Sequence, residues 1–385
     1  VTVGFHRLSI MDNSFQSNQP FIFQDNLKTV VFICNGEIYN FMELNKKYGL
    51  NINNNSDCMT IPKLYLKYDF NNFLELFNKE IKGEFSFVLL EFDSQKNLRK
   101  MIVGRDQIGI RPLYINKFEE NSKLNDLIIS SEIKGMLDYE NTVEEFAPGN
   151  LKIFDFDEFY NHQISNYQFK WVYDINITNN FSITEENNLK IYEDILLKKL
   201  REAVINSVRR RLKADRNKAF LLSGGVDSSL VCAIASKILN EPINTFCCGM
   251  GKGTDLKYAR EVAKHINSNH KEVIFTPEAG LEAIPNVIYA IESWDVTTVR
   301  ASVGQYIVSK YIGENTNCRV VFVDEGPDEV CSSYMFNWNA PNGKELDEVA
   351  KELVNEIHYF DCKRSDRCIS YFGLEGRVPL LDPEV

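Results

Sequence analysis

The stretch LLSGGVDSS, residues 221–229, carries the most specific chemical signal in the chain. It follows an apolar run typical of a strand and opens a run with helical spacing, so its backbone amides would point toward a ligand at the helix start. Two glycines allow the backbone to approach an anion closely. We therefore predict a phosphate site at Ser223, Gly224, Gly225, Ser228 and Ser229.

Asp227 stands inside this loop, where a carboxylate would repel phosphate directly. Mg²⁺ between them removes the repulsion, because Mg²⁺ binds through one or two carboxylates together with phosphate oxygens. A plain strand–turn–helix connection is the alternative, but it needs only one glycine. The loop lacks a Gly-Lys-Ser/Thr signature, so it is not a Walker A motif.

Alternating strand and helix patterns surround this loop in the second half of the chain. A capping-box pattern at Ser182–Glu185 precedes a long amphipathic helix that ends in Arg209–Arg211, which we interpret as cations favoured by the helix dipole. The alternation predicts a parallel sheet with helices on both faces. The expected strands are residues 219–222, 245–248 and 272–275, and the expected helices are residues 230–239 and 256–266.

Residues 1–170 are instead rich in short strand patterns, with one helix expected at residues 58–68. This predicts a layered antiparallel α+β domain. Asn35-Gly36 by itself indicates a turn that ends the preceding strand. The expected strands are residues 30–34, 83–90, 101–104, 127–130 and 151–154.

Composition limits the class of protein. A length of 385 residues suggests two domains, and a net charge of -11 argues against nucleic acid or an anionic membrane as the main partner. No apolar run is long enough to cross a bilayer. The nine cysteines lack CxxC spacing, which favours a reduced, cytoplasmic protein over a disulfide framework.

The loop S-G-G-x-D-S-S resembles the pyrophosphate loop of N-type ATP pyrophosphatases. Residues 295–302, 326–330 and 373–382 resemble asparagine synthetase segments, and Gly4–Arg7 resembles the eukaryotic-type form. The resemblance extends over residues 3–382. It implies an α+β N-terminal-nucleophile (αββα) glutaminase domain at residues 1–180, followed by an α/β parallel-sheet ATP pyrophosphatase domain at residues 181–385.

The resemblance also implies a glutamine site in the first domain. Arg7 matches the residue that clamps the glutamine carboxylate, as suits a guanidinium fork. Asn35 and Gly36 match the oxyanion hole, and the string NGEIYN outweighs the turn interpretation. Glu37 and Asp57 match positions that hold the glutamine α-amino group.

The family's nucleophile is a cysteine at the mature N-terminus, and residue 1 here is Val. Cys34 and Cys58 are internal and are expected to be packed thiols. We expect a fragment whose nucleophile lies upstream of Val1 and whose catalytic lysine lies beyond Val385, so that the chain as written does not hydrolyse glutamine.

In the second domain, the resemblance places the nucleotide base against Leu221 and Cys248, and aspartate at Thr297, Thr298 and Arg300. Glu325 matches the position tied to aspartyl-adenylate formation. Family members read S-G-E-G-S-D-E where this chain reads VDEGPDE. Two nucleotide positions are thereby changed, to Val323 and Asp324, and Pro327 removes one amide donor, whereas Asp328 is kept as a second Mg²⁺ ligand.

The expected function is ATP-dependent synthesis of asparagine from aspartate and glutamine-derived ammonia, through β-aspartyl-AMP. ATP and Mg²⁺ are the expected cofactors, the partners are small molecules, and a homodimer is left open. Two alternatives stand beside it. One is a β-lactam-synthetase-like relative that closes another amide, and the other is a non-catalytic homologue, which the changed residues 323–327 would suit.

Overall fold

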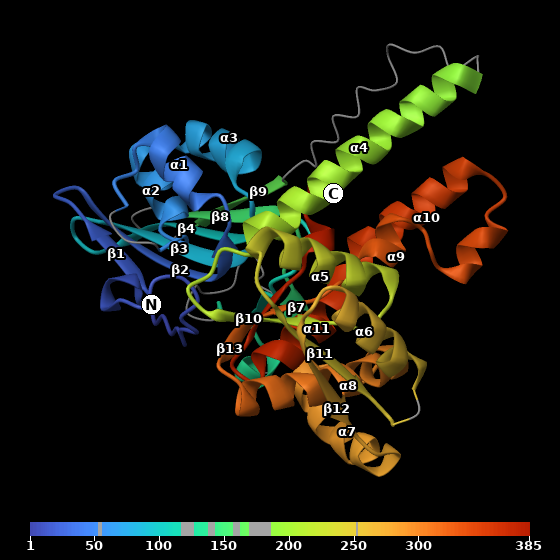
Figure 1. Ribbon diagram of the computed structural model, residues 1–385. Helices are drawn as coiled ribbons and strands as arrows, with labels where there is room; N and C mark the ends of the chain where they lie inside the picture. Colours follow the sequence, from blue (N-terminus) through green and yellow to red (C-terminus); the bar gives the residue numbers. More distant parts are fainter. Residues whose placement is uncertain (53–55, 117–126, 138–142, 157–161, 169–185, 252) are drawn as a thin grey trace.

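The computed structural model describes most of the chain, as two groups of elements separated by residues 169–185 (Figure 1). Three sheets are present: two antiparallel sheets before residue 169, and one parallel sheet after residue 185. The described residues are 1–52, 56–116, 127–137, 143–156, 162–168, 186–251 and 253–385.

A six-stranded antiparallel sheet forms the centre of the first domain. Its spatial order is β1 (Phe21–Gln24), β2 (Lys28–Ile38), β3 (Gly83–Asp93), β4 (Leu98–Arg105), β8 (Asn150–Phe156) and β9 (His162–Gln168). One face carries the helices α1 (Phe41–Tyr48), α2 (Thr60–Lys67) and α3 (Phe70–Glu80), as Figure 1 shows. An aromatic-rich core that includes Phe32, Phe73 and Phe87 fills the space between them.

The opposite face of this sheet packs on a second, three-stranded sheet of β6 (Ile129–Ser130), β5 (Tyr114–Asn116) and β7 (Val143–Glu145). Met101, Val103 and Phe154 of the large sheet meet Leu113 and Ile115 in this separate core. The described part of the domain therefore shows helices, a large sheet and a small sheet. Between β3 and β9, the only helix among the described residues is the short 3₁₀ helix Ile133–Met136. A second layer of α-helices is therefore not among the described elements of this domain.

The second domain is built on a five-stranded parallel sheet. Its order is β12 (Asn269–Ile274), β11 (Asn244–Gly249), β10 (Asn217–Leu221), β13 (Cys318–Phe322) and β14 (Glu375–Arg377). Helices α4 (Glu186–Arg211), α5 (Val226–Leu239) and α6 (Thr254–His265) cover one face. Helices α8 (Val296–Asn315) and α11 (Asp361–Ser370) cover the other, which confirms the predicted arrangement.

The remaining helices lie at the edges of this domain. They are α7 (Pro277–Ile291), the four-residue α9 (Pro327–Val330) and α10 (Gly343–Glu356). The first half of α4 extends away from the rest of the molecule in Figure 1, and Leu197 on it is 64% exposed. No helix in the described part of the chain is long and apolar enough to cross a membrane.

Apolar side chains of the first domain enter the cores of the second. Ile108 and Ile110 pack with Ala219, Phe246 and other residues around the parallel sheet. Ile10 packs on the opposite face of the same sheet, among residues of α4, α5 and α6. Because these side chains are buried, the two domains hold each other in one defined orientation.

The turn predicted at Asn35-Gly36 was wrong. Asn35-Gly36 does not end its strand, because β2 runs on to Ile38 and pairs with β3 over its whole length. Gly36 has φ of +139°, and a Cβ there would lie 2.0 Å from the Glu84 carbonyl oxygen. The glycine is thus required by close strand approach rather than by a turn. The predicted capping box at residues 182–185 lies outside the described residues.

Candidate functional site

The phosphate-loop candidate connects β10 to α5, as its sequence predicts. The hydroxyls of Ser223 and Ser228 lie 2.9 Å apart, and the Gly225 amide donates to the Ser223 hydroxyl at 3.2 Å. Gly224 has φ of +86°, and a Cβ there would lie 2.4 Å from the Ala259 amide nitrogen of α6. The loop conformation therefore depends on glycine at this position.

Ser229, in the first turn of α5, has a buried hydroxyl with no hydrogen-bond partner. Buried hydroxyls are normally paired, because an unpaired one loses its hydrogen bonds to water without replacement. The free donor at a helix start fits an anionic ligand.

A cavity of about 470 Å³ opens in front of this loop, at the carboxyl ends of the parallel strands, where ligands of such sheets bind. Eight of the predicted nucleotide, catalytic and metal residues line it: Leu221, Ser223, Asp227, Cys248, Val323, Asp324, Glu325 and Asp328. Burial raises the pKa of the Cys248 thiol to about 12, which suits a wall residue rather than a nucleophile.

Carboxylates concentrate at the phosphate end of this cavity. Burial and the neighbouring Asp328 raise the pKa of Asp227, while burial and Asp227 raise the pKa of Asp324. A cation placed among these carboxylates would relieve their mutual repulsion. No cluster of three or more metal-ligating side chains occurs among the described residues. Two carboxylates facing a phosphate loop nevertheless fit Mg²⁺, which takes its remaining ligands from water and phosphate.

Glu325 is the best-connected acid in the cavity. Arg364 of α11 pairs with it at 2.7 Å, and Gln305 of α8 donates to it at 3.4 Å. Arg364 also donates to Gln305 at 3.0 Å and pairs with Asp361. Burial raises the pKa of Glu325 to about 7, against the opposing effect of Arg364.

Sequence reasoning missed Arg364 and Gln305. Both sit in helices far along the chain from the loop they support, and α11 buries polar residues such as Ser365 and Asp366. Because the buried face of α11 is largely polar, the spacing of hydrophobic residues does not reveal which face of this helix is buried.

The changed loop at residues 323–327 keeps its place against the cavity. Val323 is buried in the apolar core around β13, and its amide donates to the Arg377 carbonyl at 3.1 Å. Gly326 has φ of +107°, and a Cβ there would lie 2.2 Å from the Leu381 side chain. Val323 thus adds apolar packing beneath the loop, and the cavity remains open above it.

The predicted aspartate residues lie at the start of α8. The Thr298 amide and hydroxyl both donate to the Asp295 carboxylate at 2.7 Å, which caps the helix. Thr297 and Arg300 are exposed. None of the three predicted residues lines the nucleotide cavity, whereas Ala301 and Gly304, further along the helix, do.

A second cavity, of about 740 Å³, lies between the two domains. All five predicted glutamine residues line it: Arg7, Asn35, Gly36, Glu37 and Asp57. Cys34 and Cys58 also line it, as buried thiols. A hydrogen bond of the Cys58 thiol to Cys34, together with burial, raises the pKa of Cys58 well above its ordinary value, so it is not a ready nucleophile.

The acids of this cavity are strongly buried. The Asp57 carboxylate accepts from the Ile38 amide at 2.6 Å, and burial raises its pKa to about 6. Burial and Asp57 raise the pKa of Glu37 well above its usual range. The Arg7 guanidinium contacts carbonyl oxygens of its own loop, including Met11 at 2.9 Å and Ser14 at 3.2 Å.

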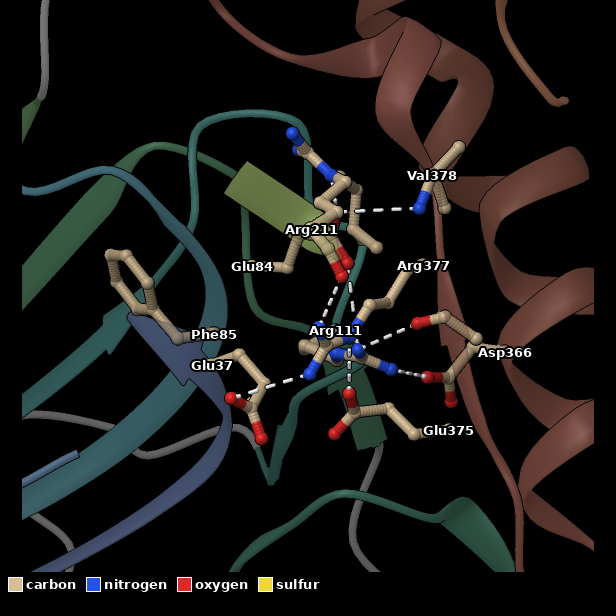
Figure 2. Close-up of polar contacts among 12 residues, drawn as sticks. Glu37, Glu84, Phe85, Arg111, Arg211, Asp366, Glu375, Arg377 and Val378 are labelled. Atoms are coloured by element: carbon tan, nitrogen blue, oxygen red, sulfur yellow. Dashed lines mark hydrogen bonds and ion pairs between the residues drawn. The ribbon is translucent and has the colours of Figure 1, made fainter. Parts of the chain in front are cut away.

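A network of buried ion pairs connects this cavity to the second domain (Figure 2). Glu84 of β3 pairs with Arg211 at 2.6 Å and with Arg111 at 3.4 Å. Arg111 also pairs with Asp366 of α11 at 2.8 Å, and Arg211 pairs with Asp382 at 2.5 Å. Arg211 was expected to serve only the helix dipole, but its side chain is 1% exposed and bridges the two domains.

Comparisons with known proteins agree with this geometry. A family model described as a glutamine amidotransferase domain matches residues 1–191, and one described as asparagine synthase matches residues 199–352. Mouse (Mus musculus) glutamine-hydrolysing asparagine synthetase is 35% identical over 403 residues, which cover 98% of this chain and 67% of the mouse protein. The probable asparagine synthetase of Acanthamoeba polyphaga mimivirus is 35% identical over 388 residues, 99% of this chain and 68% of that protein.

Among solved structures, the allosteric regulatory enzyme of purine biosynthesis is similar at 12% identity and a TM-score of 0.33. The match covers 68% of this chain and 63% of that one, and is too slight to define the fold. The sequence relatives are decisive because they extend over both domains. The chain belongs to the glutamine-hydrolysing asparagine synthetase family.

Proposed function

We propose that this protein synthesises asparagine from aspartate, using ATP and ammonia released from glutamine. The observation that carries the proposal is the presence of two cavities in one chain, one lined by the predicted glutamine residues and the other by predicted nucleotide, catalytic and metal residues. Membership of the family supports it. We assign residues 1–180 to the glutaminase, with an N-terminal-nucleophile fold, and residues 181–385 to the synthetase, with an ATP pyrophosphatase fold.

In the glutaminase half, glutamine and water give glutamate and ammonia. Arg7 binds the substrate carboxylate, and Glu37 and Asp57 hold its α-ammonium group. The Asn35 amide and the Gly36 N–H donate to the oxyanion of the tetrahedral intermediate, where one such donor is worth roughly 3 kcal/mol. Asn35 is exposed on β2 and faces the cavity, which supports this role.

In the synthetase half, the β-carboxylate of aspartate attacks the α-phosphorus of ATP, giving β-aspartyl-AMP and pyrophosphate. Ammonia then displaces AMP to form asparagine. The loop at Ser223–Ser229 holds the phosphates, Leu221 and Cys248 contact the base, and Glu325 acts at the adenylate. Thr297, Thr298 and Arg300 bind aspartate. Asp227 and Asp328 would hold Mg²⁺, which neutralises phosphate charge when bound.

An assay of the full-length protein tests this proposal. Pyrophosphate release is measured with ATP and Mg²⁺, with and without aspartate, and asparagine is measured with glutamine or ammonium chloride as the nitrogen source. We expect release that depends on aspartate, and asparagine from both sources. Ammonium chloride bypasses the glutamine site, so the two halves are tested separately. No aspartate-dependent release would overturn the synthetase assignment.

A further inference from the structure

Arg377, at the end of β14 in the second domain, reaches into the wall of the glutamine cavity. Its guanidinium lies 3.5 Å from the Glu37 carboxylate, measured from Nη2 to Oε2. The Arg377 side chain is fully buried and that of Glu37 is 8% exposed. Glu37 lines the cavity, so the contact lies immediately behind a surface that a ligand would touch.

The rest of the Arg377 guanidinium is already committed. Its Nε donates to Glu375 at 2.8 Å, and its Nη1 donates to the carbonyl oxygens of Arg211 and of Lys213, the latter at 2.6 Å. The ring of Tyr39 packs against the guanidinium at 5.4 Å. These contacts fix the plane of the group and leave Nη2 without a hydrogen bond, directed at Glu37.

Arg377 and Glu37 come from different domains and lie 340 positions apart in the chain. A buried guanidinium nitrogen without a full partner is costly, so such groups are usually paired. The acid that lies 3.5 Å from Nη2 is a residue of the proposed glutamine site. Figure 2 shows Glu37, Arg377 and Glu375 side by side, between the sheet of the first domain and the second domain.

We propose that Arg377 is a positioning residue for the glutamine site: its guanidinium, 3.5 Å from Glu37, favours the charged form of that carboxylate and fixes its position where the α-ammonium group of the substrate would bind. The inference rests on the proposed function, because it takes Glu37 as the group that binds this ammonium. It adds that the second domain completes the glutamine site, which the first domain alone would leave defective.

The charges around Glu37 support this role. Burial, Asp57 and Glu375 all raise the pKa of Glu37, whereas Arg377 and Arg111 oppose them. Loss of Arg377 would therefore raise the pKa of Glu37 further and keep the group protonated up to a higher pH. A neutral carboxyl group binds an ammonium ion weakly. The groups that face Glu37 are Asp57, Cys58, Arg111, Glu375 and Arg377.

The test compares two ligands by isothermal titration calorimetry: L-glutamine, and glutaramate, which is glutamine without its α-amino group. For Arg377→Met we expect glutamine binding to weaken by roughly 10- to 100-fold, the range for a hydrogen bond to a charged group, with glutaramate binding unchanged. The ratio of the two affinities does not depend on what fraction of the variant is folded. Arg377→Lys should keep the ratio near that of the parent.

A pH series sharpens the result. Glutamine binding by Arg377→Met should recover as pH rises, because Glu37 then loses its proton, whereas glutaramate binding should stay flat. Arg209→Met is the matched control and should behave like the parent. Arg209 is exposed at the end of α4, the helix whose Arg211 carbonyl oxygen accepts a hydrogen bond from Arg377.

If Arg377→Met does not fold, Glu375→Gln provides the opposite change. It removes a negative charge that raises the pKa of Glu37, so glutamine binding should persist to lower pH than in the parent. Equal losses for both ligands, or an unchanged pH profile in the variants, would overturn the inference. A parent protein that binds neither ligand would overturn the glutamine site itself, which is a distinguishable result.

Discussion

Two acids of the nucleotide cavity, Asp227 and Asp328, differ from the acids of the domain interface in whether the fold gives them a cationic partner. At the interface, Glu84, Asp366 and Asp382 each pair with a buried arginine. In the nucleotide cavity, Asp227 and Asp328 form no ion pair with any residue that the structure describes, and they face a phosphate loop. The paired interface acids therefore hold the two domains together, whereas Asp227 and Asp328 keep their charge available for a cation.

This contrast has an energetic consequence. The buried ion pairs fix the orientation of the two domains. Removal of one partner leaves a charge without that partner in a poorly solvated site. Unpaired acids cost stability until a cation or a substrate arrives. The same type of substitution, neutralisation of one charged residue, should therefore have opposite effects on stability in the two regions.

The largest effect is expected for Arg211→Met. Two carboxylates, Glu84 and Asp382, would each lose one of two arginine partners, the fully buried one, and the free energy of unfolding should fall by about 3–5 kcal/mol. Urea denaturation followed by circular dichroism measures it. Arg209→Met, two positions away and exposed, should change stability by less than about 0.5 kcal/mol. Equal decreases in the free energy of unfolding for the two variants would show that the buried ion pairs of Arg211 do not contribute to stability.

A smaller effect is expected for Asp227→Asn, and it concerns ligand binding. In the parent, ATP at about 100 times its dissociation constant should stabilise the fold by about 2.7 kcal/mol. In the variant, the part of this gain that requires Mg²⁺ should disappear, because the carboxylate that shares the ion is gone.

Thermal melts with ATP and Mg²⁺, compared with ATP and EDTA, measure the difference. The variant without ligand should be at least as stable as the parent, because repulsion from Asp328 is relieved. Asp347→Asn, on the exposed face of α10, is the control. An Mg²⁺-dependent gain that survives in Asp227→Asn would place the ion elsewhere.

The smallest effect is the pH dependence that Glu325 contributes. Its pKa in the fold is about 7, above the usual value, so the folded state binds a proton more tightly than the unfolded state. Stability from this group is therefore lost as pH rises from its unfolded pKa through about 7. Relative to the parent, Glu325→Gln should gain roughly 2 kcal/mol between about pH 5 and 8.

Unfolding free energies at the two pH values, for parent and variant, test this. Glu314→Gln, an acid on α8 outside the cavity, is the control and should follow the parent. If Glu325→Gln keeps the pH dependence of the parent, Glu325 ionises normally and Arg364 neutralises it fully.

Much of the fold was predictable from local patterns. The β-α alternation after residue 186 has a strong signal, because buried strands and amphipathic helices differ in period. The turn predicted at Asn35-Gly36 was wrong because a glycine is required both in tight turns and where two strands approach closely, and here the second case applies. The residues around Gly36 do not indicate that β3, about 50 positions further along the chain, lies against it.

In the two sites as well, some residues were predictable from the sequence and others were not. Residues of the phosphate loop are contiguous, so their chemistry is visible in nine positions. Arg364, Gln305 and Arg377 are not, since each acts on an acid from a distant element. Their roles depend on burial, and burial of a charged residue is the feature that composition and periodicity predict least.

The sequence by itself determined the kinds of chemistry available: a loop for phosphate, an amide and a glycine for an oxyanion, and acids for amines and metal. Only the tertiary structure decided which acids are neutralised and which stay free. The physical reason is that ion pairing depends on distances of a few ångströms in a poorly solvated interior. Arg211 and Arg377 reach such distances only when the two domains pack together.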